Sequence, residues 1–419
     1  MSDSSSTRLA YREEVVWGED PAAAASPLLP LREFRFTNES LNFEAQTEVS
    51  EEIRSDRQVA DIIRTGVESG GDVGIEFSFA SHDDLFEGAL YNDWTPVQDS
   101  NTISPLADTF LVAGSPNGST IGIGSPEVGG AALLNALTVG SFIEITESVA
   151  SPTNNGFTRV TANSLAGSIT VSPALPSIGQ DTFRIRESHL RNGTTLKSYM
   201  LEKAFLDTAS ANSPELPETI TFTGMRVGTA EINIATGSIL NGSFAFQGET
   251  ATVQAGSKIE GLISPQLVEV AATDVFNAID NVGNVLIDGV ADPNVCFTEI
   301  SISIENNLRN QPCIGQLENS GIGVGRTQVS GTLIAYFVNR DFYEKYLNFD
   351  TVALSFTITL GGNTYLFDFP SFKFTSGEVV AGGNDEDVLI STEFTAKRDP
   401  VLGFTMGINR FGTIPTLVQ

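Results

Sequence analysis

The chain has 419 residues, of which 41% are hydrophobic, 39 are glycine and 27 are phenylalanine. This length predicts two or three domains, and the abundance of Gly and Phe favours strands and turns over long helices. Lys and Arg total 23 against 52 Asp and Glu, which gives a formal net charge of -29. So acidic a chain excludes a surface built to grip nucleic acid phosphates.

Cysteine usage and the N-terminal sequence bear on where the protein is made. Cys296 and Cys313 are too few for a disulfide framework and are compatible with synthesis in a reducing cytoplasm. The stretch MSDSSSTRLAYREEVV lacks the apolar segment of a signal peptide, and we find no apolar run long enough to cross a membrane. We therefore expect no membrane anchor.

The first third of the chain begins with a polar and then Ala- and Pro-rich segment, residues 1–33, which is typical of an extended arm. Leu41, Phe43 and Ala45 then alternate with polar residues, which predicts a strand wet on one face. The polar stretch 50–71 predicts a loop with some helix. A strand at Val73–Phe79 and a short amphipathic helix near Asp84–Asp93 follow.

This order of elements returns in residues 298–350. Ile300, Ile302 and Ile304 alternate with polar residues, a polar Gly-rich loop follows, and a second strand leads into an aromatic helix. The amphipathic hairpin at residues 222–250 likewise has its counterpart at 369–399. We interpret the pattern as a diverged tandem duplication.

Residues 100–190 interrupt the first copy with alternating strands around an Asn154-Asn155-Gly156 turn, the composition of a small β domain. The predicted fold is mainly β, with two tandem β-sandwich or barrel domains, each flanked by a short helix. The expected divisions are an N-terminal arm at 1–33, a discontinuous first domain at 34–99 and 191–255, the insertion at 100–190, a linker with some strand at 256–294, and a second domain with a C-terminal tail at 295–419.

The sequence offers few residues that could form a catalytic site. His82 and His189 are the only histidines, and we interpret both as surface residues. The glycine strings Gly122–Gly130 and Gly321–Arg326 lack the Lys-Ser/Thr of a nucleotide loop, and the acidic run Asn384–Asp387 lacks the spacing of a calcium loop. We expect no enzyme activity, no cofactor and no metal.

Several separated motifs, in order, resemble the major tail tube proteins of siphophages, the phages with long non-contractile tails. They are RLAYREEVVWGEDP near the start, SLNFEAQTEVSEEIRSDRQVADI, NNGFTRVTA in the insertion, and SYMLEKAFLD followed by FTGMRVGTAEINIATGSILNGSFAFQG. The resemblance covers most of residues 8–250, and the second copy matches by its pattern of elements.

The resemblance implies a structural virion protein whose β-sandwich joins its sheet to those of its neighbours in a continuous barrel. A chain with two such folds is expected to form a homotrimeric ring with pseudo-sixfold symmetry, and the rings to stack into the tail tube in the host cytoplasm. The implied partners are further copies of this chain, the tape measure protein, and the tail terminator and tail-tip proteins. Genomic DNA would pass through the lumen towards the host without specific binding.

The alternation of apolar and polar residues predicts which side chains of this expected barrel face the lumen. One set of residues is predicted to pack the sandwich: Leu41, Phe43, Val73, Ile75, Phe77, Ile232, Ile234, Leu240, Phe244, Phe246, Ile300, Ile302, Ile304, Leu333 and Phe337. Their neighbours are predicted to face the lumen: Asn42, Glu44, Glu76, Glu231, Asn233, Asn241, Gln247, Glu299, Ser301, Ser303, Glu305 and Glu393, with Ser78, Ser243 and Thr332. None is basic, so the predicted bore offers DNA phosphates no cationic trap.

The two loops, at about 47–72 and 305–327, are expected to contact the next ring, with Arg54, Arg57 and Arg64 as candidates for ion pairs across that contact. The insertion would lie outside the tube. A glycan-binding tail or surface adhesin is the alternative function, although residues 100–190 contain no Trp or Tyr. A β-scaffold glycan hydrolase and a contractile-tail tube protein are further alternatives.

Overall fold

The structure, a computed structural model, describes residues 3–19, 30–100, 109–115, 118–123, 130–149, 151–176, 179–207, 217–256, 267–269, 273–291, 295–338, 340–381 and 383–413. It is mainly β, as the composition predicts, and the α-helices in the described part are short. They are α2 (Asp83–Leu90), α4 (Gly130–Ala136) and α5 (Asp341–Leu347).

Six strands form a first antiparallel group, and each hydrogen-bonds to the next in a fixed order. In that order they are β4 (Asn42–Val49), β5 (Ile62–Glu76), β17 (Asn241–Gly248), β16 (Glu218–Ala235), β15 (Tyr199–Phe205) and β1 (Thr7–Glu13). The short β3 (Asn38–Glu39) and β18 (Thr250–Ala255) add to β5 and β16.

A second group repeats this order with strands from the C-terminal half of the chain. Its strands are β21 (Phe297–Glu305), β24 (Gln328–Tyr336), β28 (Leu389–Ala396), β26 (Asn363–Phe374), β25 (Val352–Leu360) and β20 (Val282–Ile287). The short β27 (Glu378–Val380) extends β26 along β28. The pairing of β16 with β21, the internal junction, makes the two groups one sheet.

Irregularities in the ladders recur at matching places in the two groups. The β15–β16 ladder shifts register between Tyr199 and Leu201, and the β25–β26 ladder shifts between Val352 and Leu354. β-bulges of this kind bend a strand and are features of a fold rather than defects. Their coincidence shows that the two groups share strand order and also local strand shape.

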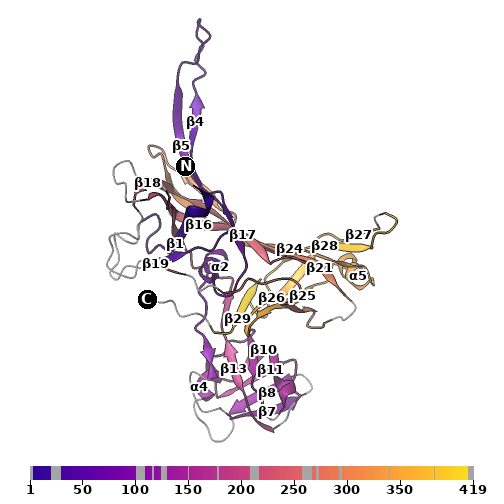
Figure 1. The fold of residues 1–419 in the computed structure, drawn as a ribbon. Coiled ribbons are helices and arrows are strands. Elements are labelled where there is room, and N and C mark those ends of the chain that lie inside the picture. The colour runs from indigo at the N-terminus through magenta and orange to yellow at the C-terminus, as the bar shows by residue number, and fades with distance from the viewer. Residues whose placement is uncertain are drawn as a thin grey trace.

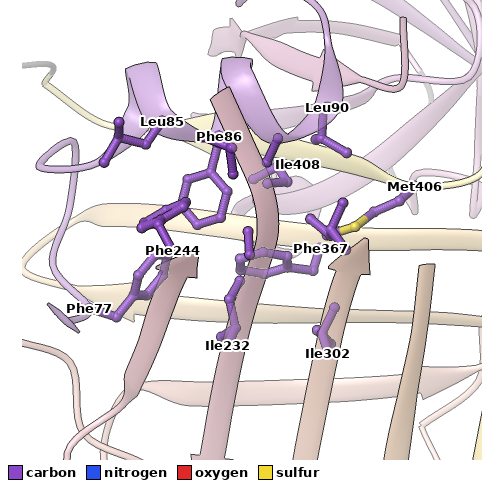
Figure 2. Close-up of a cluster of buried hydrophobic side chains, with 14 of the residues drawn as sticks. Phe77, Leu85, Phe86, Leu90, Ile232, Phe244, Ile302, Phe367, Met406 and Ile408 are labelled. Atoms are coloured by element: carbon purple, nitrogen blue, oxygen red, sulfur yellow. The ribbon is translucent and has the colours of Figure 1, made fainter. Parts of the chain in front are cut away.

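One hydrophobic core runs through both groups, and α2 lies over it. Figure 2 shows Leu85 and Phe86 of α2 above Ile232 of β16 and Ile302 of β21, with Phe367 of β26 beside them. The acidic first turn of α2, Asp83 and Asp84, suits the positive end of the helix dipole. A helix from the first group thus covers residues of the second.

Asp83 carries the polar part of this contact. Its carboxylate accepts hydrogen bonds from the Tyr365 hydroxyl on β26 and from the Arg410 guanidinium on β29 (Gly407–Phe411). The Tyr365 oxygen accepts in turn from the backbone N–H of Ala80, at 2.8 Å. Asp83 is 6% exposed, so these bonds lie in a region with little competing water.

The insertion is a separate lobe with its own core (Figure 1). Its strands pair in the order β12-β7-β8-β11-β10-β9-β13-β6. Their bounds are β6 (Gln98–Asp99), β7 (Thr109–Ser115), β8 (Gly118–Ile123), β9 (Phe142–Thr146), β10 (Gly156–Asn163), β11 (Ser168–Ser172), β12 (Gly179–Thr182) and β13 (Arg184–Glu187).

An ion pair fixes the insertion to the second group. The Arg159 guanidinium donates two bonds to the Asp368 carboxylate, at 2.8 and 2.6 Å, and lies over the Phe142 ring. Burial raises the pKa of Asp368, and the charge of Arg159 opposes that rise. The insertion is therefore held by a charged bond as well as by the apolar contact of Phe142 with Leu366 and Phe411.

Three expectations about segments differ from the structure. Residues 50–71 are not a loop with helix: β4 and β5 continue as a hairpin that projects from the molecule (Figure 1), and only 50–61 connect them. Within the expected arm, Thr7–Glu13 is a sheet strand whose Leu9 and Tyr11 are buried. In the expected tail, β29 pairs with β26 and with β14 (His189–Arg191). Main-chain pairing outweighed the polar composition of the hairpin.

Two residues expected in the core are partly exposed, and one residue expected at the lumen is buried. Phe43 is 37% and Phe337 is 36% exposed, because Phe43 lies on an edge strand and Phe337 follows the last residue of β24. Ser78 is 1% exposed, and its hydroxyl donates to the Ser81 hydroxyl at 2.7 Å. Ser78 follows the end of β5, where the strand alternation no longer applies.

Replacing Asp83 tests the contact between α2 and the second group. Asp83→Ala leaves Tyr365 and Arg410 without their buried acceptor, so we expect the free energy of unfolding to fall by about 3 kcal/mol. Thermal unfolding measured by circular dichroism checks this. Asp56→Ala, which removes an exposed hairpin ion pair, is the control and should leave the midpoint unchanged. Equal midpoints for both variants would contradict the account.

Candidate functional site: an acidic sheet face and two open edges

One face of the joined sheet is predominantly polar, and the strand registers define it. Asn241 lies opposite both Glu76 and Asn233, which places the three side chains on the same face. Asn233 in turn lies opposite Ser301 across the internal junction. Because directly opposed residues share a face, every residue predicted for the lumen in these strands lies on this one side.

The same registers place nine carboxylates on this face, which we call the acidic face. They are Glu44, Glu68, Asp72, Glu76, Glu231, Glu299, Glu305, Glu378 and Glu393. Each of these residues is exposed or half-buried. Glu44 lies directly opposite Glu68, an arrangement that costs stability because like charges repel.

Neighbouring positions in the register bring the predicted residues into two shallow hollows. Glu231, Asn233, Ser301, Ser303 and Glu393 line one. Asn42, Glu44, Gln247 and Glu305 line the other. Thr332 also lines the first hollow, and Glu76, Asn241, Ser243 and Glu299 belong to the same face by register.

Two cations that are not among the predicted site residues lie at one end of the acidic face. Arg226 is opposite Gln247, and Lys373 is opposite Thr395. The Arg226 guanidinium donates to the Ile322 carbonyl at 2.7 Å and lies over the Trp17 ring. The Lys373 ammonium donates to the Phe349 carbonyl at 2.7 Å. Both positive groups are therefore bonded to their own chain.

A partly buried carboxyl group lies near the Arg226 end. Burial raises the pKa of Glu249 to about 7, and the carboxylates of Glu318 and Glu14 add to the rise. Glu14 is itself buried, which raises its pKa, although its carboxylate accepts bonds from the Gly224 and Gly18 amides. Near neutral pH this corner therefore carries less negative charge than its composition suggests.

The strands that carry the acidic face pair in the order β4-β5-β17-β16-β21-β24-β28-β27, and this row ends in two open edges. Among the described residues, β4 hydrogen-bonds to β5, and β27 to β28, with no strand on the other side of either. Every residue of β4 and of β27 is exposed. Such an edge presents unpaired N–H and C=O groups, and folded proteins normally cover or pair it.

The three arginines predicted for contacts between rings lie on the projecting hairpin. Arg54 donates to Asp56 of the same hairpin, at 3.2 and 3.1 Å. Arg64 lies over the Phe43 ring, 5.6 Å from its centroid. Arg57 has a left-handed backbone, with φ of 59°, in the connection between β4 and β5. Apolar side chains accompany them: Ile53 is 99% and Val59 63% exposed.

The histidines do not lie at the surface as expected. His82 and His189 are 1% and 6% exposed. Burial lowers the pKa of His82 to about 4, and His189 Nδ1 bonds to the Glu187 carboxylate. His82 precedes the first residue of α2, and His189 is the first residue of β14.

The glycine strings and the acidic run named in the sequence can also be located. Gly321–Gly323 belong to β23 (Asn319–Gly323), which pairs with β22 (Arg309–Pro312) as a hairpin, and Asn384–Asp387 are exposed. Residues 124–129 of the other glycine string lie outside the described part. Within the described ranges, no group of three or more His, Cys, Asp and Glu residues could hold a metal ion, and no helix is long and apolar enough to span a membrane.

Comparison with known proteins gives a family. No curated protein matches the chain. The phage tail tube protein family matches residues 4–396, which include both strand groups, the insertion and the internal junction. The chain therefore belongs to the phage tail tube protein family and is a structural component of the virion.

Proposed function

We propose that three copies of this chain close into a ring, that the rings stack into the tail tube of a siphophage, and that the acidic face lines the bore. The family assignment supports a tube. The number of chains rests on the repeated strand order: two equivalent groups per chain make a ring of three chains equivalent to a ring of six single units.

The observation that carries this proposal is the internal junction. It joins the last part of β16 to β21, so one group already pairs with the next through backbone hydrogen bonds. The open edges of β4 and β27 lie at the two ends of the row of strands that carries the acidic face. Pairing these edges between chains closes the sheet and removes both edges.

The orientation rests on charge. A protein that only needed a soluble surface would have no reason to place Glu44 opposite Glu68 or to gather nine carboxylates on one face. A bore that carries DNA gains from this arrangement, because each missing phosphate contact removes a salt-dependent binding site. The bonds of Arg226 and Lys373 to backbone carbonyls keep the nearest positive charges out of the path.

The remaining contacts follow from this arrangement. The β4–β5 hairpin, with exposed Ile53 and Val59 and with Arg54, Arg57 and Arg64, contacts the next ring. The lumen holds the tape measure protein during assembly in the host cytoplasm, and the terminator and tip proteins cover the two ends. The insertion lies outside the bore, because its strands add nothing to the acidic face.

The mass of the smallest closed ring tests the number of chains. Native mass spectrometry and negative-stain microscopy of the purified protein should show rings of three 44.6 kDa chains with six similar inner units. A ring of six chains, or a compact oligomer without a central hole, would contradict the proposal.

Charge reversal on the acidic face tests the passage of DNA. Glu231→Lys with Glu393→Lys places new cations in one hollow. We expect tubes of normal shape but a genome ejection rate lower by about tenfold or more, with partial recovery at high salt. The control, Glu231→Gln with Glu393→Gln, should eject DNA almost as fast as the parent phage. Equal ejection rates for the lysine and glutamine variants would contradict the proposal that DNA passes along this face.

Changing the hairpin tests the contact between rings. Ile53→Ser with Val59→Ser removes exposed apolar side chains and leaves the sheet intact. We expect rings of normal mass and far fewer or shorter tubes in electron micrographs, because apolar contact area between rings is lost. The matched control is Val401→Ser, a substitution of an equally exposed residue (86%) outside the hairpin. Tubes of normal length would show that the hairpin is not the stacking contact.

A further inference from the structure

The internal junction contains the information needed to assign the contact between chains residue by residue. This inference rests on the proposed ring and adds which residues meet and in which register. Directly opposed residues form rows that cross each strand group. Where a row of the first group has the same residue spacing and the same bulge beside it as a row of the second group, the edge residues at the ends of the two rows occupy equivalent positions.

Two pairs of rows match. The first row runs Arg226, Gln247, Gly70, Asn42 in the first group and Lys373, Thr395, Ser330, Ser303 in the second. The next row runs Glu231, Ser243, Gly74, Asn38 in the first group and Glu378, Ser391, Ile334, Glu299 in the second.

The bulge between these rows is also shared. From Arg226 to Glu231 the chain advances five residues while β17 advances four, from Gln247 to Ser243. In the second group the chain advances five residues from Lys373 to Glu378 while β28 advances four, from Thr395 to Ser391. Each strand thus has one extra residue at the same place, and Glu378 is the counterpart of Glu231.

The internal junction shows what these edge residues meet. Glu231 lies opposite Ser303, and Ile232 lies opposite Ile302. The counterpart of Ser303 is Asn42, and the counterpart of Ile302 is Leu41. We infer that β27 of one chain pairs antiparallel with the β3–β4 edge of its neighbour, with Glu378 opposite Asn42 and Val379 opposite Leu41.

Exposure on the two edges supports this register. Ile232 and Ile304 are 1% and 0% exposed, because the internal junction covers both. Their counterparts Val379 and Phe43 are each 37% exposed in the single chain. Val379 and Phe43 are therefore exposed because no strand in the described part of the chain pairs with either edge. A second copy of this chain supplies the missing strand to both edges.

Cysteine cross-linking tests the register. In a background in which the exposed Cys296 and Cys313 are replaced by Ser, Glu378→Cys is combined with Asn42→Cys. Directly opposed Cβ atoms lie about 4.5–5.5 Å apart. After oxidation we expect most of the protein to run as disulfide-linked dimers and closed trimers on a non-reducing denaturing gel.

Two further pairs serve as controls. Glu378→Cys with Glu44→Cys is displaced by two residues on the same face, a diagonal of about 7–8 Å, and should cross-link at least tenfold more slowly. Glu231→Cys with Ser303→Cys spans the internal junction and should form its bond within one chain.

The outcomes separate the register from the ring. The mass and shape of the reduced form of every variant are also measured, by native mass spectrometry and negative-stain microscopy. Three-chain rings in which the Glu44 pair cross-links faster than the Asn42 pair would overturn this register and leave the ring intact. Particles that never form rings would overturn the ring and the register with it. Fast linkage of the Asn42 pair in three-chain rings supports both.

Discussion

The pairing of β16 with β21 is the contact on which the rest of the structure depends. It joins two strand groups with the same pairing order into one sheet, and it places Ala230, Ile232 and Ile234 against Ile300, Ile302 and Ile304. A single hydrophobic core forms beneath it, covered by α2. The Asp83 bonds to Tyr365 and Arg410 hold that helix to the second group.

The same pairing organises the electrostatics. Because side chains alternate along a strand, a continuous register gives a continuous polar face opposite the core. The chain uses that face for carboxylates and keeps Arg226 and Lys373 bonded to backbone carbonyls. One geometric constraint thus sets the core, the acidic face and the two open edges. We propose that these are the parts from which the closed bore of the tail tube is built.

Alternation of apolar and polar residues made much of this predictable from the sequence. It correctly placed Ile300, Ile302 and Ile304 in the core and put Glu231, Ser301 and Ser303 together on the opposite face. The helices near Asp84 and after Arg340 were also expected, and the structure confirms them as α2 and α5. These features depend on local periodicity, which a single sequence records.

Features that depend on distant partners were harder to predict. The polar hairpin of β4 and β5 has few buried residues, so only its cross-strand hydrogen bonds reveal it. His82 and His189 became buried through contacts with remote segments. Thr7–Glu13 forms a strand because it pairs with β15 (Tyr199–Phe205), which lies far along the chain. The bulges between Arg226 and Glu231 and between Lys373 and Glu378, which set the register used for the junction, are recognised only from the cross-strand pairing.

The most direct test of the central claim is a cryo-electron microscopy reconstruction of the assembled tube at side-chain resolution. We predict one uninterrupted inner barrel in which internal and inter-chain junctions alternate, with Glu231, Glu305 and Glu393 facing the bore. A reconstruction with the acidic face turned outward, or with β4 and β27 unpaired at chain boundaries, would contradict the account.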